Sequence, residues 1–110
     1  MSGMNFGQDD ESSEEIKKLY ALEAEEHLNN ITGKLFDLEE GRETLLNTLT
    51  EIYRPIHSIK GDSNVLGFIE IGNTAHDLET YIQTIKSNPD DFNKEKLEEL
   101  FLYIENMRGL

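Results

Sequence analysis

Apolar residues recur every three or four positions along most of this chain, and that spacing restricts its fold more than any other feature. The clearest run is Leu45, Leu49, Ile52, Ile56, Ile59 and Leu66, with Ser63 in the one slot that lacks an apolar residue. Spacings of three and four place side chains on one face of an α-helix, whereas strands would show an alternating pattern that the sequence lacks. We therefore expect an all-α fold.

Capping and turn residues divide the pattern into four helical segments. The first is predicted to begin at Ser12, where Ser-Ser-Glu-Glu has capping-box spacing, and to end at Gly41. Gly67 ends the second segment, Pro89 follows the third, and Asn93 is predicted to cap the fourth. The other three apolar faces are Ile16, Tyr20, Ala24, Leu28, Ile31, Leu35 and Leu38; Ile71, Ala75, Leu78, Ile82 and Ile85; and Leu97, Leu100, Phe101, Ile104 and Met107. Because short loops favour antiparallel neighbours, we predict an up-down-up-down antiparallel four-helix bundle.

Composition and charge limit the setting of this bundle. Residues 1–12 are acidic and glycine-rich, so we expect a disordered head followed by one domain at 13–110. The net charge of −13 opposes binding to nucleic acid or an anionic membrane and favours a positively charged protein partner. The absence of cysteine fits a reducing cytoplasm, and no apolar run approaches the ~20 residues that span a bilayer. We expect a cytoplasmic, monomeric domain.

The residues most suited to a chemical reaction lie on one turn of the second segment. They are His57, Lys60 and Gly61. At ~100° per residue, His57 lies on the flank of the apolar face. Glycine inside a helix costs about 1 kcal/mol relative to alanine, so Gly61 indicates a need for open space one turn after the imidazole. Neutral imidazole is a nucleophile near neutral pH, and the mobile charge of Lys60 can follow an anion. This combination suits attack on phosphorus.

The third segment offers a carboxylate that could orient the imidazole. Glu79 and His76 lie on the flank of its apolar face. His57 and Glu79 are ten and twelve residues away from Gly67 on its two sides, so an antiparallel pair of helices brings them to nearly the same level. A carboxylate that accepts a hydrogen bond from Nδ1–H would fix the tautomer and leave the Nε2 lone pair facing outward.

These residues lead to a family resemblance. His57-Ser-Ile-Lys-Gly61, followed by Leu66-Gly-Phe68, resembles the signature of histidine phosphotransfer (HPt) domains. It is most similar to the amino-terminal phosphotransfer domain of CheA-type chemotaxis kinases. The segments Glu23-Ala-Glu-Glu-His-Leu28 and Phe36-Asp-Leu38, together with the His76/Glu79 pair, extend the resemblance over about residues 15 to 108.

The resemblance implies that His57 accepts a phosphoryl group on Nε2 from ATP in a histidine-kinase domain and passes it to an aspartate of a response-regulator receiver domain. Lys60 would lie near the phosphoryl oxygens, and Gly61 would provide clearance. Glu79 would hold the other ring nitrogen, with His76 in support. The domain would bind no cofactor or metal, because partner domains supply ATP and Mg²⁺. It would be a phosphocarrier rather than an enzyme by itself, as part of a multidomain kinase.

We have further expectations for the residues close to His57. Tyr53, Arg54 and Asn64 are predicted to complete a docking face for partners, although Tyr53 fits simple packing equally well. Pro55 is expected to bend the helix close to His57. Asp62 adds negative charge where relatives often have a small residue. The chain stops after its fourth predicted helix, whereas many CheA-type domains continue into a fifth.

Other functions compete with this interpretation. A stand-alone HPt shuttle between receiver domains would need the same residues. A non-catalytic interaction module also fits, because an acidic bundle can bind partners without chemistry. A di-iron or di-manganese site needs Glu-x-x-His on two helices, and none of the three histidines has a glutamate three positions before it. The sequence lacks a glycine-rich phosphate loop, which excludes a complete kinase.

Overall fold

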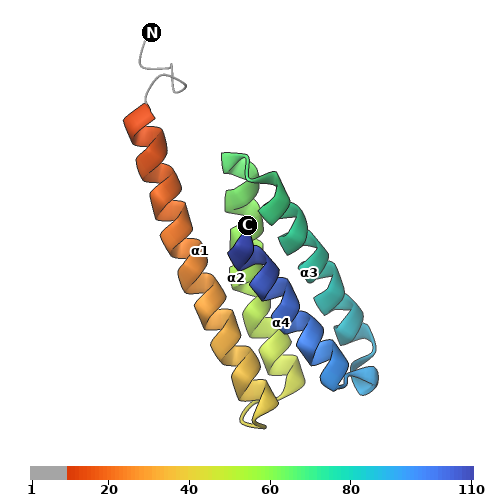
Figure 1. Ribbon diagram of the computed structural model, residues 1–110. Helices are drawn as coiled ribbons and strands as arrows, with labels where there is room; N and C mark the ends of the chain where they lie inside the picture. The colour runs from red at the N-terminus through yellow and green to blue at the C-terminus, as the bar shows by residue number, and fades with distance from the viewer. Residues whose placement is uncertain (1–9) are drawn as a thin grey trace.

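Four helices make up most of the chain in this computed structural model, which describes residues 10–110 (Figure 1). They are α1 (Asp10–Glu39), α2 (Leu45–Leu66), α3 (Ile69–Ser87) and α4 (Lys94–Gly109), with a short 3₁₀ turn, η3 (Pro89–Asp91), before α4. Each helix packs against the next, and α4 packs against α1, so the four close into an antiparallel bundle. The predicted all-α, up-down-up-down architecture is confirmed. Within residues 10–110 no helix is long and apolar enough to cross a membrane.

The helix ends follow from the turn and capping residues. Gly41 and Gly67 have φ angles of 77° and 85°, in the left-handed region that glycine reaches at little cost. The side chain of Asn93 accepts a hydrogen bond of 2.9 Å from the backbone amide three residues later, as predicted for the start of α4. Thr44 caps α2 in the same way at 3.2 Å, and this cap was not predicted.

The first helix begins earlier than predicted. It starts at Asp10, so the capping box at Ser12 lies inside α1 and does not mark its beginning. Residues 1–9, the larger part of the head predicted to be disordered, lie outside the described residues.

The core consists mainly of the predicted apolar faces. Its buried members are Leu28, Ile31, Leu35, Leu49, Ile52, Ile56, Ile59, Ala75, Leu78, Ile82, Ile85, Leu97, Leu100, Ile104 and Met107. The prediction was wrong for Ile16, which is 50% exposed. At 1.5 Å per residue, α1 is about 45 Å long and α4 only about 24 Å. The first turns of α1 therefore continue past the end of α4, where that helix does not cover them (Figure 1).

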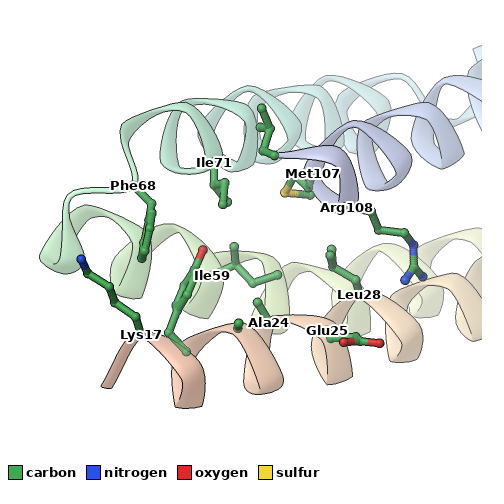
Figure 2. Close-up of a pocket in the computed structure, with 12 residues that line it drawn as sticks. Lys17, Ala24, Glu25, Leu28, Ile59, Phe68, Ile71, Met107 and Arg108 are labelled. Carbon is green, nitrogen blue, oxygen red and sulfur yellow. The ribbon is translucent and has the colours of Figure 1, made fainter. Parts of the chain in front are cut away.

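An apolar groove of about 470 Å³ opens where α4 ends. Figure 2 shows Phe68 and Ile71, at the α2–α3 end of the bundle, facing Ala24 and Leu28 of α1, and Met107 of α4 also lines the groove. One wall of the groove therefore comes from α1, and the other comes from residues near the turn between α2 and α3. The turn of α2 that carries His57, Lys60 and Gly61 contributes only the buried Ile59 to the lining of this groove.

A buried pair of hydroxyls explains the polar slot in the apolar face of α2. The hydroxyl oxygens of Tyr20 and Ser63 lie 2.6 Å apart. The ring of Tyr20 also stacks on Phe68, with 4.9 Å between centroids and 15° between planes. Because buried hydroxyl groups need hydrogen-bond partners, a serine in this slot satisfies Tyr20. The pair thereby joins α1 to the last turn of α2.

Candidate functional site

His57 stands on the exposed flank of α2, as predicted. Its side chain is 63% exposed. The nearby Ile56 and Ile59 are almost completely buried, at 0% and 2% exposure. Because these two residues hold one face of α2 against the core, His57 is placed at the edge of that face and not within it.

Glu79 of α3 lies behind the imidazole and holds one of its nitrogens. The Nδ1 atom of His57 is 2.8 Å from Oε2 of Glu79, whose side chain is only 7% exposed. An ionised carboxylate can only accept hydrogen bonds, so Nδ1 carries the proton and Nε2 keeps the lone pair. The contact predicted between His57 and Glu79 is therefore present. It leaves Nε2 as the nitrogen available for chemistry.

Lys60 pairs with the same carboxylate in the unmodified domain, and its predicted role near the phosphoryl oxygens stays a prediction. Its Nζ atom lies 2.6 Å from Oε1 of Glu79, and its side chain is 24% exposed. The two oxygens of Glu79 thus serve two different partners, His57 and Lys60. With a neutral imidazole, the positive charge of Lys60 balances the negative charge of the buried carboxylate.

The surroundings keep Glu79 ionised. Burial alone would raise the pKa of its carboxyl group. Hydrogen bonds from Lys60 and His57, together with the charges of the same two residues, outweigh burial and lower that pKa below its ordinary value. Glu79 is consequently a carboxylate at neutral pH, which is the form that can fix the His57 tautomer.

Gly61 leaves the predicted open space beside the imidazole. It is exposed, and a Cβ atom built on it meets nothing within 4 Å apart from the adjacent backbone. Helix side chains lean toward the helix amino terminus, so a side chain at this position would extend toward the turn that carries His57. The glycine therefore keeps one approach to the imidazole clear.

Tyr53 lies one turn before His57 and stacks on it. The two ring centroids are 6.1 Å apart and the planes differ by 10°. Tyr53 is half-buried and packs against the core, so the packing role that the sequence left open is present. Its predicted part in docking stays a prediction. The spacing of four residues between an aromatic ring and a histidine is the sequence signal for this contact.

The other predicted docking residues lie on the surface of α2. Arg54 and Asn64 are both exposed. The Asn64 side chain lies over Gly72 of α3, where a Cβ atom would collide with its amide oxygen. Asn64 thus takes part in the close approach of α2 and α3, and its role in docking stays a prediction, as does that of Arg54.

Three further residues singled out in the sequence have less contact with this site. His76 is exposed on α3, and within residues 13–110 its ring forms no hydrogen bond with His57, Lys60 or Glu79, so its supporting role stays a prediction. Pro55 lies inside α2, which continues unbroken through it, and the proline does not prevent the His57–Glu79 contact. Asp62 is exposed. Across the described residues no group of three His, Cys, Asp or Glu side chains is placed to hold a metal ion.

Comparison with known proteins identifies the family. The Hpt domain family matches residues 15–109. The chemotaxis protein CheA of Rhizobium meliloti (strain 1021) is 31% identical over 84 residues, which cover 76% of this chain and 11% of that protein. CheA of Bacillus subtilis (strain 168) is 28% identical over 88 residues, covering 80% and 13%. CheA of Halobacterium salinarum is 24% identical over 92 residues, covering 82% and 13%.

The chain thus spans between 11% and 13% of the length of these three relatives. No solved structure matches it. The family match covers nearly all of the described helices and agrees with the resemblance seen in the sequence. This chain is therefore a histidine phosphotransfer domain and belongs to the Hpt domain family.

Proposed function

We propose that His57 accepts a phosphoryl group on Nε2 from ATP bound to a histidine-kinase domain and passes it to an aspartate of a response-regulator receiver domain. The observation that carries this proposal is an exposed imidazole whose Nδ1 atom is held by a buried carboxylate. That arrangement turns the unprotonated nitrogen toward solvent. The relatives are chemotaxis proteins, which supports a chemotaxis signalling pathway as the setting.

The two transfers follow from the tautomer. In the first, the Nε2 lone pair attacks the γ-phosphorus of ATP, the bond to the β–γ bridging oxygen breaks, and ADP leaves. The proton stays on Nδ1, where Glu79 stabilises the positive charge that the ring gains. In the second, an aspartate oxygen attacks the same phosphorus, the P–N bond breaks, and the imidazole returns to its neutral form. No proton has to leave the ring in either step.

Lys60 has a second role in this scheme. In the unmodified domain its ammonium group pairs with Glu79. A phosphoryl group on the adjacent imidazole provides a second anion within reach of a flexible lysine side chain, so Lys60 can stabilise the phosphorylated form. We propose that ATP and Mg²⁺ are held by partner domains, and that this cytoplasmic domain is a phosphocarrier and not an enzyme by itself.

Substitution of the acceptor tests the proposal. The wild-type domain, incubated with labelled ATP and the ATP-binding kinase domain of a CheA relative, should acquire a label that is labile in acid and stable in base. His57→Gln should remove the label while the domain stays helical and folded, because His57 is exposed and lies outside the core. His76→Gln and His27→Gln serve as matched controls and should keep the labelling site. A label that survives in His57→Gln would contradict the assignment.

A second measurement separates the two relay schemes. Labelling by the kinase domain supports the CheA-type route. Labelling only by phosphorylated receiver domains, with none from the kinase, would support the alternative of a shuttle between receivers. A panel of receiver domains should then show which of them removes the phosphoryl group from the domain.

A further inference from the structure

The ring of Tyr53 covers one side of the imidazole. The two rings are nearly parallel, with 10° between planes and 6.1 Å between centroids. This separation lies within the range in which offset-stacked aromatic rings attract each other. Tyr53 lies four residues before His57 and Gly61 four residues after it, so the imidazole stands between a ring on one side and open space on the other.

One hydrogen bond cannot by itself fix the orientation of this imidazole. The contact with Glu79 restrains the distance from Nδ1 to the carboxylate, but coupled rotations about the Cα–Cβ and Cβ–Cγ bonds can still tilt the ring at that distance. With 63% of its side chain exposed, His57 has few other contacts that limit this tilt. Tyr53 packs against the core, so its ring is a fixed surface for the imidazole to lie on.

We propose that Tyr53 is a positioning residue for phosphoryl transfer. The Nε2 lone pair lies in the plane of the imidazole, so the plane decides the direction from which phosphorus can be attacked. Glu79 fixes the nitrogen behind the ring and Tyr53 fixes the plane, and the two together aim Nε2. Holding a reactant in the direction of attack raises the transfer rate without any contact to the donor. This inference rests on the proposed function, because it takes His57 as the acceptor.

A small phosphoryl donor separates positioning from docking. Phosphoramidate carries a phosphoryl group on ammonia and is far too small to use a protein docking face. With it, Nε2 forms a bond to phosphorus, the bond between phosphorus and ammonia breaks, ammonia leaves, and the proton stays on Nδ1. A residue that only contacts a protein partner cannot change this rate, whereas a residue that aims Nε2 changes it.

Two substitutions of Tyr53 make the comparison. Tyr53→Leu keeps an apolar side chain against the core but removes the flat ring, whereas Tyr53→Phe keeps the ring. We expect the phosphoramidate rate constant of Tyr53→Leu to fall about three- to tenfold, the range that corresponds to one aromatic pair, and that of Tyr53→Phe to stay near wild type. With the kinase domain as donor, the loss should fall on the maximal rate and not on KM. The same variants carrying His57→Gln measure labelling at other sites.

Nuclear magnetic resonance of the imidazole supplies a readout that does not depend on phosphorylation. In the wild type and Tyr53→Phe, the ring protons of His57 should be shielded by the neighbouring aromatic ring, and this shielding should disappear in Tyr53→Leu. The ¹⁵N shifts should show the Nδ1–H tautomer in all three, because Glu79 is unchanged. If circular dichroism shows that Tyr53→Leu does not fold, Tyr53→Met replaces it.

Four results would overturn the inference. They are a wild-type phosphoramidate rate in Tyr53→Leu, an equally slow rate in Tyr53→Phe, a rise in KM alone with the kinase domain, and identical imidazole proton shifts in all variants. Failure of the proposed function has a different signature. In that case wild-type His57 takes no label from any donor, while the shielding by Tyr53 is still observed.

Discussion

Replacing Gly61 should change stability and phosphotransfer in opposite directions. Alanine is about 1 kcal/mol more favourable than glycine in a helix interior. At Gly61 the added Cβ meets open space and the backbone does not have a positive φ, so no steric cost offsets that gain. We expect Gly61→Ala to raise the free energy of unfolding by about 1 kcal/mol, which corresponds to an increase in Tm of about 4 °C for a chain of this size.

A longer side chain at the same position should stop the chemistry. Leucine has a helix propensity close to that of alanine, so Gly61→Leu should also stabilise the bundle. Its branched end would lean over the turn that carries His57 and occupy the approach to Nε2. We expect the single-turnover rate of phosphorylation to fall about tenfold or more, because small displacements of a donor cost large factors in rate. Gly61→Ala, with one methyl group, should lose much less.

Urea denaturation and single-turnover labelling together test this reasoning. Gly33 is the matched control, since it is an exposed glycine in α1 whose added Cβ also meets nothing within 4 Å. Gly33→Leu should raise stability as Gly61→Leu does, and its phosphorylation rate should stay at the wild-type level. Full activity in Gly61→Leu would refute the idea that glycine is there for clearance. A loss of stability in Gly61→Ala would refute the claim that a Cβ atom at this position meets open space.

Two other buried contacts give further predictions. Glu79→Gln should slow phosphorylation and lower the free energy of unfolding at pH 7 by about 1–2 kcal/mol, because it removes the charge that Lys60 and His57 share. The lowered pKa of Glu79 means that this stabilisation is complete above about pH 4.3 and is lost as pH falls through the folded-state pKa. Urea titrations at pH 7 and pH 3 should therefore show a difference between wild type and variant that shrinks in acid, and a constant difference would contradict the linkage. Tyr20→Phe should cost about 1 kcal/mol in thermal unfolding and leave the labelling rate unchanged, since it only removes the hydrogen bond to Ser63; an unchanged Tm would mean that this bond contributes nothing.

The fold was predictable because the signals that determine it lie in short stretches of the sequence. Apolar residues at helical spacing define which face of each helix is buried, and Gly41, Gly67 and Asn93 mark ends that depend only on neighbouring backbone. The error at Ile16 has a different origin. A repeating pattern shows which face is apolar, but it does not show where the neighbouring helix stops. Here α1 has 30 residues and α4 only 16, so the first turns of α1, where Ile16 lies, have no α4 beside them.

The contacts of the candidate site were predictable only where the number of residues between two positions of the α2–α3 hairpin was enough to place them. Similar distances in sequence from Gly67 placed His57 and Glu79 at nearly the same level of the two helices, and the structure shows their contact. The pairing of Lys60 with the second oxygen of Glu79 depends on how α2 and α3 are rotated against each other, which spacing does not determine. Tyr53 was ambiguous for a similar reason. A half-buried aromatic residue one turn from a histidine can face a partner or the imidazole, and the angle between ring planes decides between them.

The imidazole has one nitrogen available for transfer, because Glu79 holds the other, and this has a consequence for timing. Glu79 lies behind the ring, Tyr53 covers one side, and the gap over Gly61 faces solvent. In the proposed function, the kinase domain and the receiver domain must each bring a reacting group to the same Nε2 atom, so they would not reach it together. Each phosphoryl group would then travel by successive encounters, with the first partner gone before the second arrives. Tight binding to either partner would slow the transfer from one partner to the other, so brief, weak complexes suit this geometry.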